Sequence, residues 1–139
     1  MFYIGIKIIE AWPEVKENRK GYGVKYPDGY ISWSPKDAFE SAYYPMGEKD
    51  NTTTAKMIEN FLLPPQTKKL DEKTTQVLSE TITGFTQYQT SSCVDPDNYN
   101  YAMAEELCMK KIYDKLWSYF GFIVQWGKFG LKNKEKNKK

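Results

Sequence analysis

The residues with the most defined chemistry lie between Ser91 and Tyr99, in the sequence Ser-Ser-Cys-Val-Asp-Pro-Asp-Asn-Tyr. This segment joins a polar, strand-like stretch to the predicted start of a long helix, where free backbone N–H groups favour an anion. The hydroxyl of Ser92 would add a further hydrogen-bond donor. Asp95 and Asn98 could instead only cap the helix, with the serines small so that the helix packs closely. The local pattern leaves both interpretations open.

Side chains that commonly perform catalysis are scarce. The chain has no histidine, which excludes Ser-His and Cys-His nucleophilic catalysis and metal sites that use imidazole. Cys93 and Cys108 lack the CxxC spacing of a structural zinc site. The neighbouring carboxylates Asp95 and Asp97 have a spacing that is common at solvated helix starts. We therefore expect no catalytic residue, no metal site and no cofactor, and we do not expect an enzyme.

Aromatic residues are abundant, with four Trp, eleven Tyr and seven Phe. Some must fill the core, but exposed rings also stack on bases and fill protein interfaces. A stacked base contributes about 1–3 kcal/mol. The sequence does not separate core from ligand contacts among the candidates, which are Trp12, Trp33, Phe85, Tyr88, Tyr99 and Tyr101.

Short strands and helices must position these residues. Residues 2–9 alternate with period two and place Phe2, Ile4, Ile6 and Ile8 on one face, which predicts a strand. The charged residues 14–20 predict a loop. The other expected elements are hairpins over 22–33 and 73–94, a helix capped by Ser34, helices over 52–63 and 97–120, and a short strand over 122–126.

This order of strands, helices, strands and a final helix is typical of an α+β fold with antiparallel pairing. We expect an antiparallel sheet built from hairpins and packed against a long C-terminal amphipathic helix. A single small sheet covers one face of that helix, so a second apolar line on it predicts association of two or more copies. The first line is Cys108, Ile112, Leu116 and Tyr119, and the second is Met109, Tyr113, Trp117 and Phe120.

Length and charge indicate one domain followed by a basic tail. The 139 residues fit a single domain, which we expect over 1–126. The chain has 20 basic and 18 acidic residues, but six lysines and one glutamate lie from Gly127 onward, which leaves 14 basic and 17 acidic residues in the body. We expect 127–139 to be a disordered, solubilising tail. We expect no specific DNA binding, because duplex-binding domains carry a basic face on the folded body.

No segment predicts export or membrane insertion. The apolar opening lacks a basic n-region and a small-residue cleavage site. No apolar run approaches the ~20 residues that cross a bilayer. We expect a protein of the cytoplasm without a membrane partner.

A long motif covers about residues 72–125. It consists of Ser92-Cys93-Val94-Asp95-Pro96 with Asn98-Tyr99, then Lys115-Leu116-Trp117 and Gly121-Phe122. It resembles a family of small tailed-phage proteins, the gene-product-forty-nine family. The family pattern is a strand ending in S-A-C-V-D-P-x-N-F/Y, a helix ending near K-I-W and a G-F/Y turn. Here Ser92 stands where the pattern has alanine.

The first half contains a second distinctive string, from Gly21-Tyr22 through Tyr26-Pro27-Asp28-Gly29-Tyr30-Ile31-Ser32-Trp33-Ser34-Pro35-Lys36 to Ala42-Tyr43. It is similar to a leader that occurs on small phage proteins, joined both to this family and to Thoeris anti-defence proteins. The chain thus resembles the first Thoeris anti-defence family. Those proteins are sponges that bind glycocyclic ADP-ribose from the host TIR enzyme and hold it uncut. Some also take cyclic oligonucleotides, and they assemble as dimers or as hexamers built from dimers.

The resemblance implies roles for individual residues. Phe85 or Tyr88 would stack on a ligand base, Asn98 would bind the ligand's polar groups, and Lys115 would meet phosphate. Lysine stands at that position where an arginine would give a bidentate contact, and Arg19 is the other cationic candidate. With the local features above, the predicted ligand-binding residues are Phe85, Tyr88, Ser92, Asp95, Asn98, Tyr99, Lys115, Trp12 and Arg19.

The function that these observations favour is a phage sponge for a cyclic nucleotide immune signal, acting without cleavage in the cytoplasm of the infected host. Two alternatives stay open. The surplus aromatic and apolar residues could form a surface that binds and blocks a host protein. An enzyme that degrades nucleotides is the third possibility, and the absence of histidine disfavours it.

Overall fold

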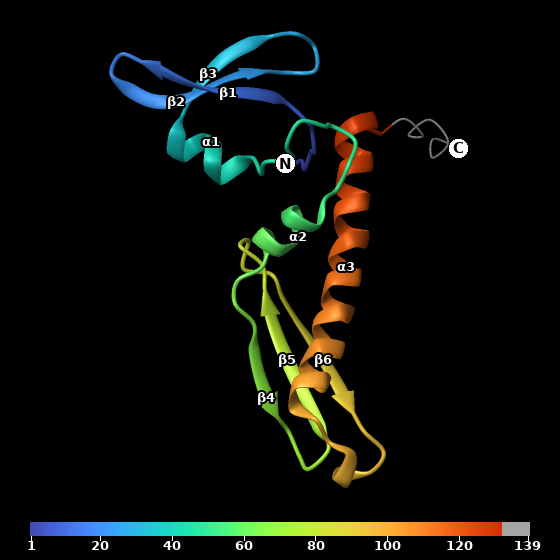
Figure 1. Ribbon diagram of the computed structural model, residues 1–139. Helices are drawn as coiled ribbons and strands as arrows, with labels where there is room; N and C mark the ends of the chain where they lie inside the picture. Colours follow the sequence, from blue (N-terminus) through green and yellow to red (C-terminus); the bar gives the residue numbers. More distant parts are fainter. Residues whose placement is uncertain (132–139) are drawn as a thin grey trace, which may run out of the picture. The chain divides into compact units, whose positions relative to one another are not determined.

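The computed structural model describes residues 1–131, and their contacts divide the chain into two compact units (Figure 1). Unit 1 comprises Met1–Thr52 and the segment that starts at Phe122, and unit 2 comprises Thr53–Gly121. Each unit contains one three-stranded antiparallel sheet. The predicted α+β class with antiparallel hairpins and a long C-terminal helix is therefore confirmed.

The sheet of unit 1 has the order β1-β2-β3, with β1 at Glu10–Lys16, β2 at Arg19–Lys25 and β3 at Ile31–Pro35. The β1–β2 turn places Glu17 and Asn18 at φ of 51° and 62°, in the left-handed region that hairpin turns require. The predicted loop over 14–20 is therefore wrong. The charged side chains of this segment are exposed to solvent on a hairpin. A run of charged residues is also typical of a loop, so the sequence alone did not distinguish the two.

The strand predicted over 2–9 is also wrong, because residues 1–9 precede β1 without joining a sheet. Period-two alternation alone does not make a strand when no neighbouring strand supplies hydrogen bonds. Ile6 and Ile8 instead lie against Gly127 of the C-terminal helix, also in unit 1. Pro13, expected to end a strand, lies inside β1, which is an edge strand where proline is tolerated.

The predicted hairpin over 22–33 is confirmed by β2 and β3. Its turn closes through Gly29 N–H to the Tyr26 carbonyl at 2.8 Å, with Gly29 at φ of 91°. Ser34 was expected to cap the next helix, but it belongs to β3, and α1 (Lys36–Ala42) starts after Pro35 without a side-chain cap.

The sheet of unit 2 has the order β4-β5-β6, with β4 at Gln66–Lys69, β5 at Thr74–Glu80 and β6 at Thr86–Ser92. The short helix α2 (Ala55–Phe61) precedes it, and the Thr54 hydroxyl caps that helix by accepting from the Met57 N–H. The sequence did not predict β4, whose four residues are polar. The hairpin predicted over 73–94 is confirmed by β5 and β6.

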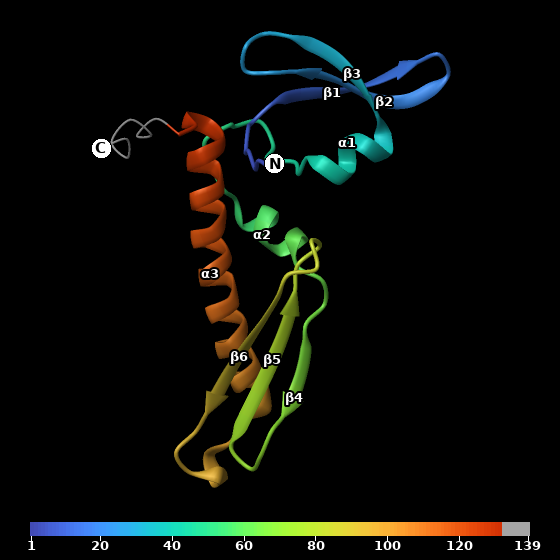
Figure 2. The same ribbon diagram turned by 180° about the vertical axis from the view of Figure 1, so that it is seen from behind.

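The long helix α3 covers Tyr101–Phe129, and its first part runs alongside the β4-β5-β6 sheet in both views (Figure 1 and Figure 2). Residues 122–126 are helical, so the predicted final strand and the turn at Gly121-Phe122 are both wrong. β-branched residues lower helix propensity only slightly, and a helix already nucleated for five turns continues through them. α3 also includes Gly127–Phe129, where the tail was expected to begin.

α3 buries one line of side chains spaced four apart, Ala104, Cys108, Ile112, Leu116 and Phe120. The predicted line ended at Tyr119, but Tyr119 is 41% exposed and Phe120 takes the buried place, in edge contact with Phe61 at 5.0 Å. On β5 the alternate residues Thr75, Val77 and Ser79 are buried. The remaining residues 132–139 of the predicted tail lie outside the described residues, and the single domain over 1–126 stays a prediction.

Candidate ligand-binding sites

The outer face of β6 carries Tyr88 and Ser92. Alternate side chains of β6 point to opposite faces, and Gln87 reaches α3, where its Nε2 donates to the Tyr119 hydroxyl at 2.9 Å. Tyr88 therefore points away from the helix and is 59% exposed. The Ser92 and Thr74 hydroxyls lie 3.0 Å apart on this outer face.

Phe85 lies at the β5–β6 turn and is 57% exposed. Its carbonyl accepts from the Thr81 N–H at 2.9 Å, which closes the turn. Neither Phe85 nor Tyr88 faces the core, because both residues are more than half exposed. Both are therefore accessible to a ligand.

The turn after β6 places Asp95 and Asn98 around a short 3-10 helix, η1 (Pro96–Asn98). The Asp95 carboxylate accepts from the Asp97 N–H at 2.9 Å and caps η1, not the long helix that it was expected to cap. The predicted cap of α3 at Asn98 is wrong, because α3 starts later and Asn100 accepts from the Met103 N–H at 3.0 Å. Asn98 is exposed, which leaves its amide available to a ligand.

Tyr99 is half-buried and connects this turn to the sheet. Its hydroxyl lies 2.5 Å from the hydroxyl of Thr75, which is fully buried. The Lys69 ammonium lies 4.5 Å from the centre of the Tyr99 ring. Tyr99 thus has a structural role, and the cation beside it adds positive charge to this end of unit 2.

Lys115 is exposed on α3, one turn after Lys111, whose ammonium donates to the Thr90 carbonyl at 3.1 Å. At 1.5 Å per residue, Lys115 lies about 21 Å along the helix from Tyr101. Asn98 and Lys115 of one chain are therefore too far apart to touch one small ligand.

The structure brings only part of the predicted site together. Ser92, Asp95, Asn98 and Tyr99 gather at one end of unit 2, where β6 ends and α3 begins. Phe85 is at the other end of β6, and a seven-residue strand at ~3.3 Å per residue separates the two by about 23 Å. Closeness in the sequence motif does not become closeness in space, because the connecting segment is extended.

Trp12 and Arg19 belong to unit 1. The Trp12 ring covers Gly23, where an added Cβ would approach it to 2.2 Å. The Arg19 guanidinium lies 5.7 Å from the centre of the Trp33 ring, which covers Gly21. Both residues therefore lie on one face of the β1-β2-β3 sheet, with Trp33 beside them.

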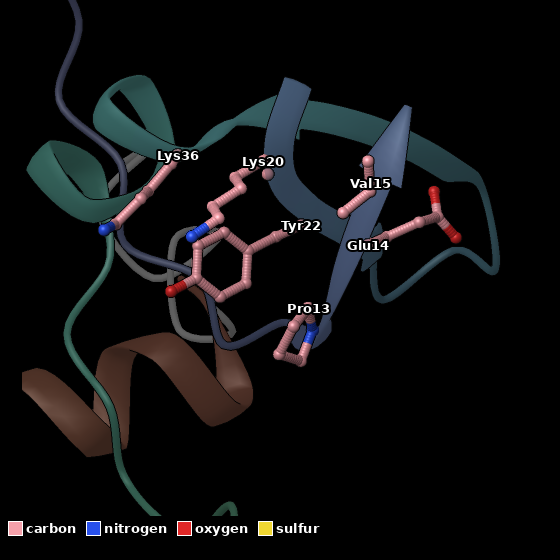
Figure 3. Close-up of a pocket in the computed structure, with 7 residues that line it drawn as sticks. Pro13, Glu14, Val15, Lys20, Tyr22 and Lys36 are labelled. Carbon is pink, nitrogen blue, oxygen red and sulfur yellow. The ribbon is translucent and has the colours of Figure 1, made fainter. Parts of the chain in front are cut away.

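The opposite face of the same sheet contains a hollow that the sequence did not indicate (Figure 3). Lys20, Tyr22 and Lys36 line it. The available signal was the alternation of Lys20 and Tyr22 along β2, which puts both side chains on one face. Lys36 joins them only through the β3–α1 connection, which sequence spacing does not reveal.

Among residues 1–131, no three His, Cys, Asp or Glu side chains gather as a metal site would require. Cys108 is buried between α3 and β5, and this burial raises the pKa of its thiol. Across the same residues, every helix is too short or too polar to span a bilayer.

Comparison with protein families shows to which family the chain belongs. The model of the phage protein (N4 Gp49/phage Sf6 gene 66) family matches residues 39–127, which include all of unit 2. The chain belongs to this family. No curated protein and no solved structure matches it. The predicted membership of a phage gene-product family is confirmed, and the match starts well before the motif at Ser92.

Proposed function

We propose that this phage protein binds and sequesters a cyclic nucleotide immune signal of the glycocyclic ADP-ribose type, or a cyclic oligonucleotide, without cleaving it. It would act in the cytoplasm of the infected host, where such a signal accumulates. The observation that carries the proposal is the exposed ring of Tyr88 on the outer face of β6, the face that also carries the paired hydroxyls of Thr74 and Ser92 further along the strand. The family resemblance of the sequence supplies the ligand class.

The chemistry of this surface suits a nucleotide. An exposed aromatic ring stacks on a base of any sequence, which contributes about 1–3 kcal/mol. The hydroxyls of Thr74 and Ser92 and the amide of Asn98 offer donors and acceptors to ribose and base edges. Lys69, which lies beside the Tyr99 ring, supplies a cation for phosphate. Lys115 would have to come from a second copy of the chain, because it lies about 21 Å along α3 from Tyr101.

Binding without turnover is consistent with the residue types present. The chain has no histidine for general-base catalysis. Burial raises the pKa of Cys108, which keeps its thiol protonated and unreactive. These observations favour a sponge over a nucleotide-degrading enzyme.

The decisive experiment tests both binding and integrity of the ligand. Purified protein is incubated with glycocyclic ADP-ribose and a panel of cyclic oligonucleotides, washed and heat-denatured, and the released species are identified by chromatography. We expect the added compound to return unchanged, and Tyr88→Ala to release much less of it. Tyr30→Ala, which removes another exposed ring, in unit 1, is the matched control.

A linear product that increases with protein and time would overturn sequestration in favour of an enzyme. If Tyr88→Ala and wild type released equal amounts of the ligand, the outer face of β6 would not be part of the binding site.

Blocking of a host protein is a second candidate function. The exposed apolar side chains of Met103, Leu107 and Trp117 on α3 favour it, because such groups are common in protein interfaces. Failure to retain any cyclic nucleotide would make this candidate the better explanation.

A further inference from the structure

The hollow in unit 1 is built by three elements (Figure 3). It has a volume of about 320 Å³, and Pro13, Val15, Lys20, Tyr22 and Lys36 line it. Pro13 pairs with Tyr22, and Val15 pairs with Lys20, so that β1 and β2 form its floor. Lys36 is the first residue of α1 and closes one side.

Two ammonium groups and one aromatic ring face this hollow. Figure 3 shows the Nζ atoms of Lys20 and Lys36 on the hydroxyl side of the Tyr22 ring. Within residues 1–131 neither ammonium forms an ion pair or a hydrogen bond, in contrast to Lys110, Lys111 and Lys128. Two positive charges therefore face one small volume without protein partners in the part of the chain that is described.

Two carboxylates lie near the hollow, and each has a hydrogen-bond partner in the protein. Glu14 borders the hollow, but its side chain points away and accepts from the Trp12 indole N–H at 3.3 Å on the opposite face of the sheet. Glu40 on α1 accepts from the Tyr22 hydroxyl at 2.6 Å. That hydrogen bond fixes the ring and is the main reason why the pKa of Tyr22 is raised, so the phenol stays neutral.

The Tyr22 ring offers one free side. Phe39 of α1 stacks on its other side, with the ring centres 4.2 Å apart and the planes inclined by 23°. The side chains of Pro13 and Val15 extend the apolar surface beside the ring. A flat group can therefore contact apolar surface while a charged group reaches the lysines.

We propose that this hollow binds a phosphate monoester that carries a flat ring, of the size of a nucleoside monophosphate. A phosphate monoester carries close to two negative charges at pH 7, which matches the ammonium groups of Lys20 and Lys36. The free side of the Tyr22 ring matches a base. Trp12 covers Gly23 and Trp33 covers Gly21, so the hollow lies on the sheet face opposite to those rings. The inference therefore stands apart from sequestration by unit 2.

Isothermal titration calorimetry of the full chain tests the site with AMP, adenosine and inorganic phosphate. We expect one AMP per chain, and about tenfold or more weaker binding of adenosine and of phosphate, since each supplies only half of the contacts. Lys20→Met and Lys36→Met should each weaken AMP binding by about tenfold or more. Both side chains are exposed, so these variants should melt like wild type.

Three controls separate this site from other causes of binding. Lys25→Met removes an exposed lysine from the other face of β2 and should leave AMP affinity unchanged. Lys20→Arg keeps the positive charge and should retain most of the affinity. Tyr88→Ala alters unit 2 and should not affect AMP binding.

Absence of AMP binding would overturn the proposal. An equal loss in Lys25→Met would show general charge attraction, and equal affinity for phosphate would show that the ring has no part. Loss of AMP binding in Tyr88→Ala would place AMP on unit 2 instead.

Discussion

At the residue scale, a substitution of Asn98 tests ligand binding without affecting the fold. The Asn98 side chain is exposed and makes no hydrogen bond to the rest of residues 1–131. We expect Asn98→Ala to change the free energy of unfolding by less than about 0.5 kcal/mol. Its affinity for the cyclic nucleotide should fall about tenfold, which corresponds to about 1.4 kcal/mol. Urea denaturation and calorimetry measure the two effects.

Asn100 supplies the matched control for that variant. It caps α3 through the Met103 N–H, so Asn100→Ala should lower stability by about 0.5–2 kcal/mol and leave affinity unchanged. Normal ligand binding by Asn98→Ala would remove this residue from the site.

Tyr99 should behave in the opposite way. Its hydroxyl meets the buried hydroxyl of Thr75, so Tyr99→Phe removes a partner from a group that water does not reach. We expect a loss of about 1–3 kcal/mol in the free energy of unfolding. Tyr88→Phe removes an exposed hydroxyl and should change stability by less than about 0.5 kcal/mol. Equal denaturation midpoints for the two variants would contradict this difference.

The sequence predicted site residues by type better than by position. Asp95 as a cap and Ser92 at the end of a strand follow from local chemistry, which the structure repeats. The distance between Phe85 and Asn98 does not follow, because it depends on the length and direction of β6. The hollow at Lys20 and Tyr22 depends on strand register, which no local pattern encodes.

At the element scale, two glycines have opposite roles. An added Cβ at Gly21 would approach the Ser34 carbonyl oxygen of the neighbouring strand to 2.3 Å, and backbone cannot rotate away. At Gly121, inside α3, an added Cβ meets nothing within 4 Å. The first glycine permits close strand packing, and the second only weakens a helix.

We therefore expect Gly21→Ala to lower the free energy of unfolding by about 1–3 kcal/mol or more. Gly121→Ala should raise it by up to about 1 kcal/mol, because alanine has the higher helix propensity. Thermal unfolding, monitored by circular dichroism, shows whether each variant is less or more stable than wild type. A Gly21→Ala variant as stable as wild type would mean that β2 and β3 can move apart without lowering the free energy of unfolding.

Elements with their own turn chemistry were the ones that the sequence predicted well. Pro27-Asp28-Gly29 located the β2–β3 turn, since glycine takes the positive φ there. Residues 2–9 and 122–126 failed for a common reason. Apolar, β-branched residues favour a strand, but the neighbouring elements decide whether a strand, a helix or neither forms.

At the scale of the whole molecule, α3 presents apolar groups that the sheet of unit 2 does not cover. Met103, Leu107 and Trp117 are 59%, 47% and 43% exposed. Their spacing places them on one side of the helix, as in the seam of a coiled coil. The salt bridge between Lys110 and Asp114 lies between them on that side, which could fix the register of a partner helix.

We expect this seam to join two copies of the chain about a two-fold axis, because a closed two-fold dimer is the commonest arrangement of identical subunits. Lys115 lies about 21 Å along α3 from Tyr101, so that Asn98 and Lys115 of one chain cannot touch the same small ligand. A dimer would allow both residues to contact one ligand. One residue would come from each copy, and the ligand would bind between them. Leu107→Lys should therefore abolish both the dimer and nucleotide binding.

Light scattering at micromolar concentration tests the prediction together with calorimetry. Wild type should scatter as a multiple of 16.3 kDa, and Leu107→Lys as a monomer, because a buried unpaired ammonium opposes association. Leu107→Met keeps an apolar side chain of similar volume and should keep both properties. A wild-type monomer that binds the nucleotide with full affinity would contradict both the seam and the shared site, since one chain cannot place Asn98 and Lys115 on the same small ligand.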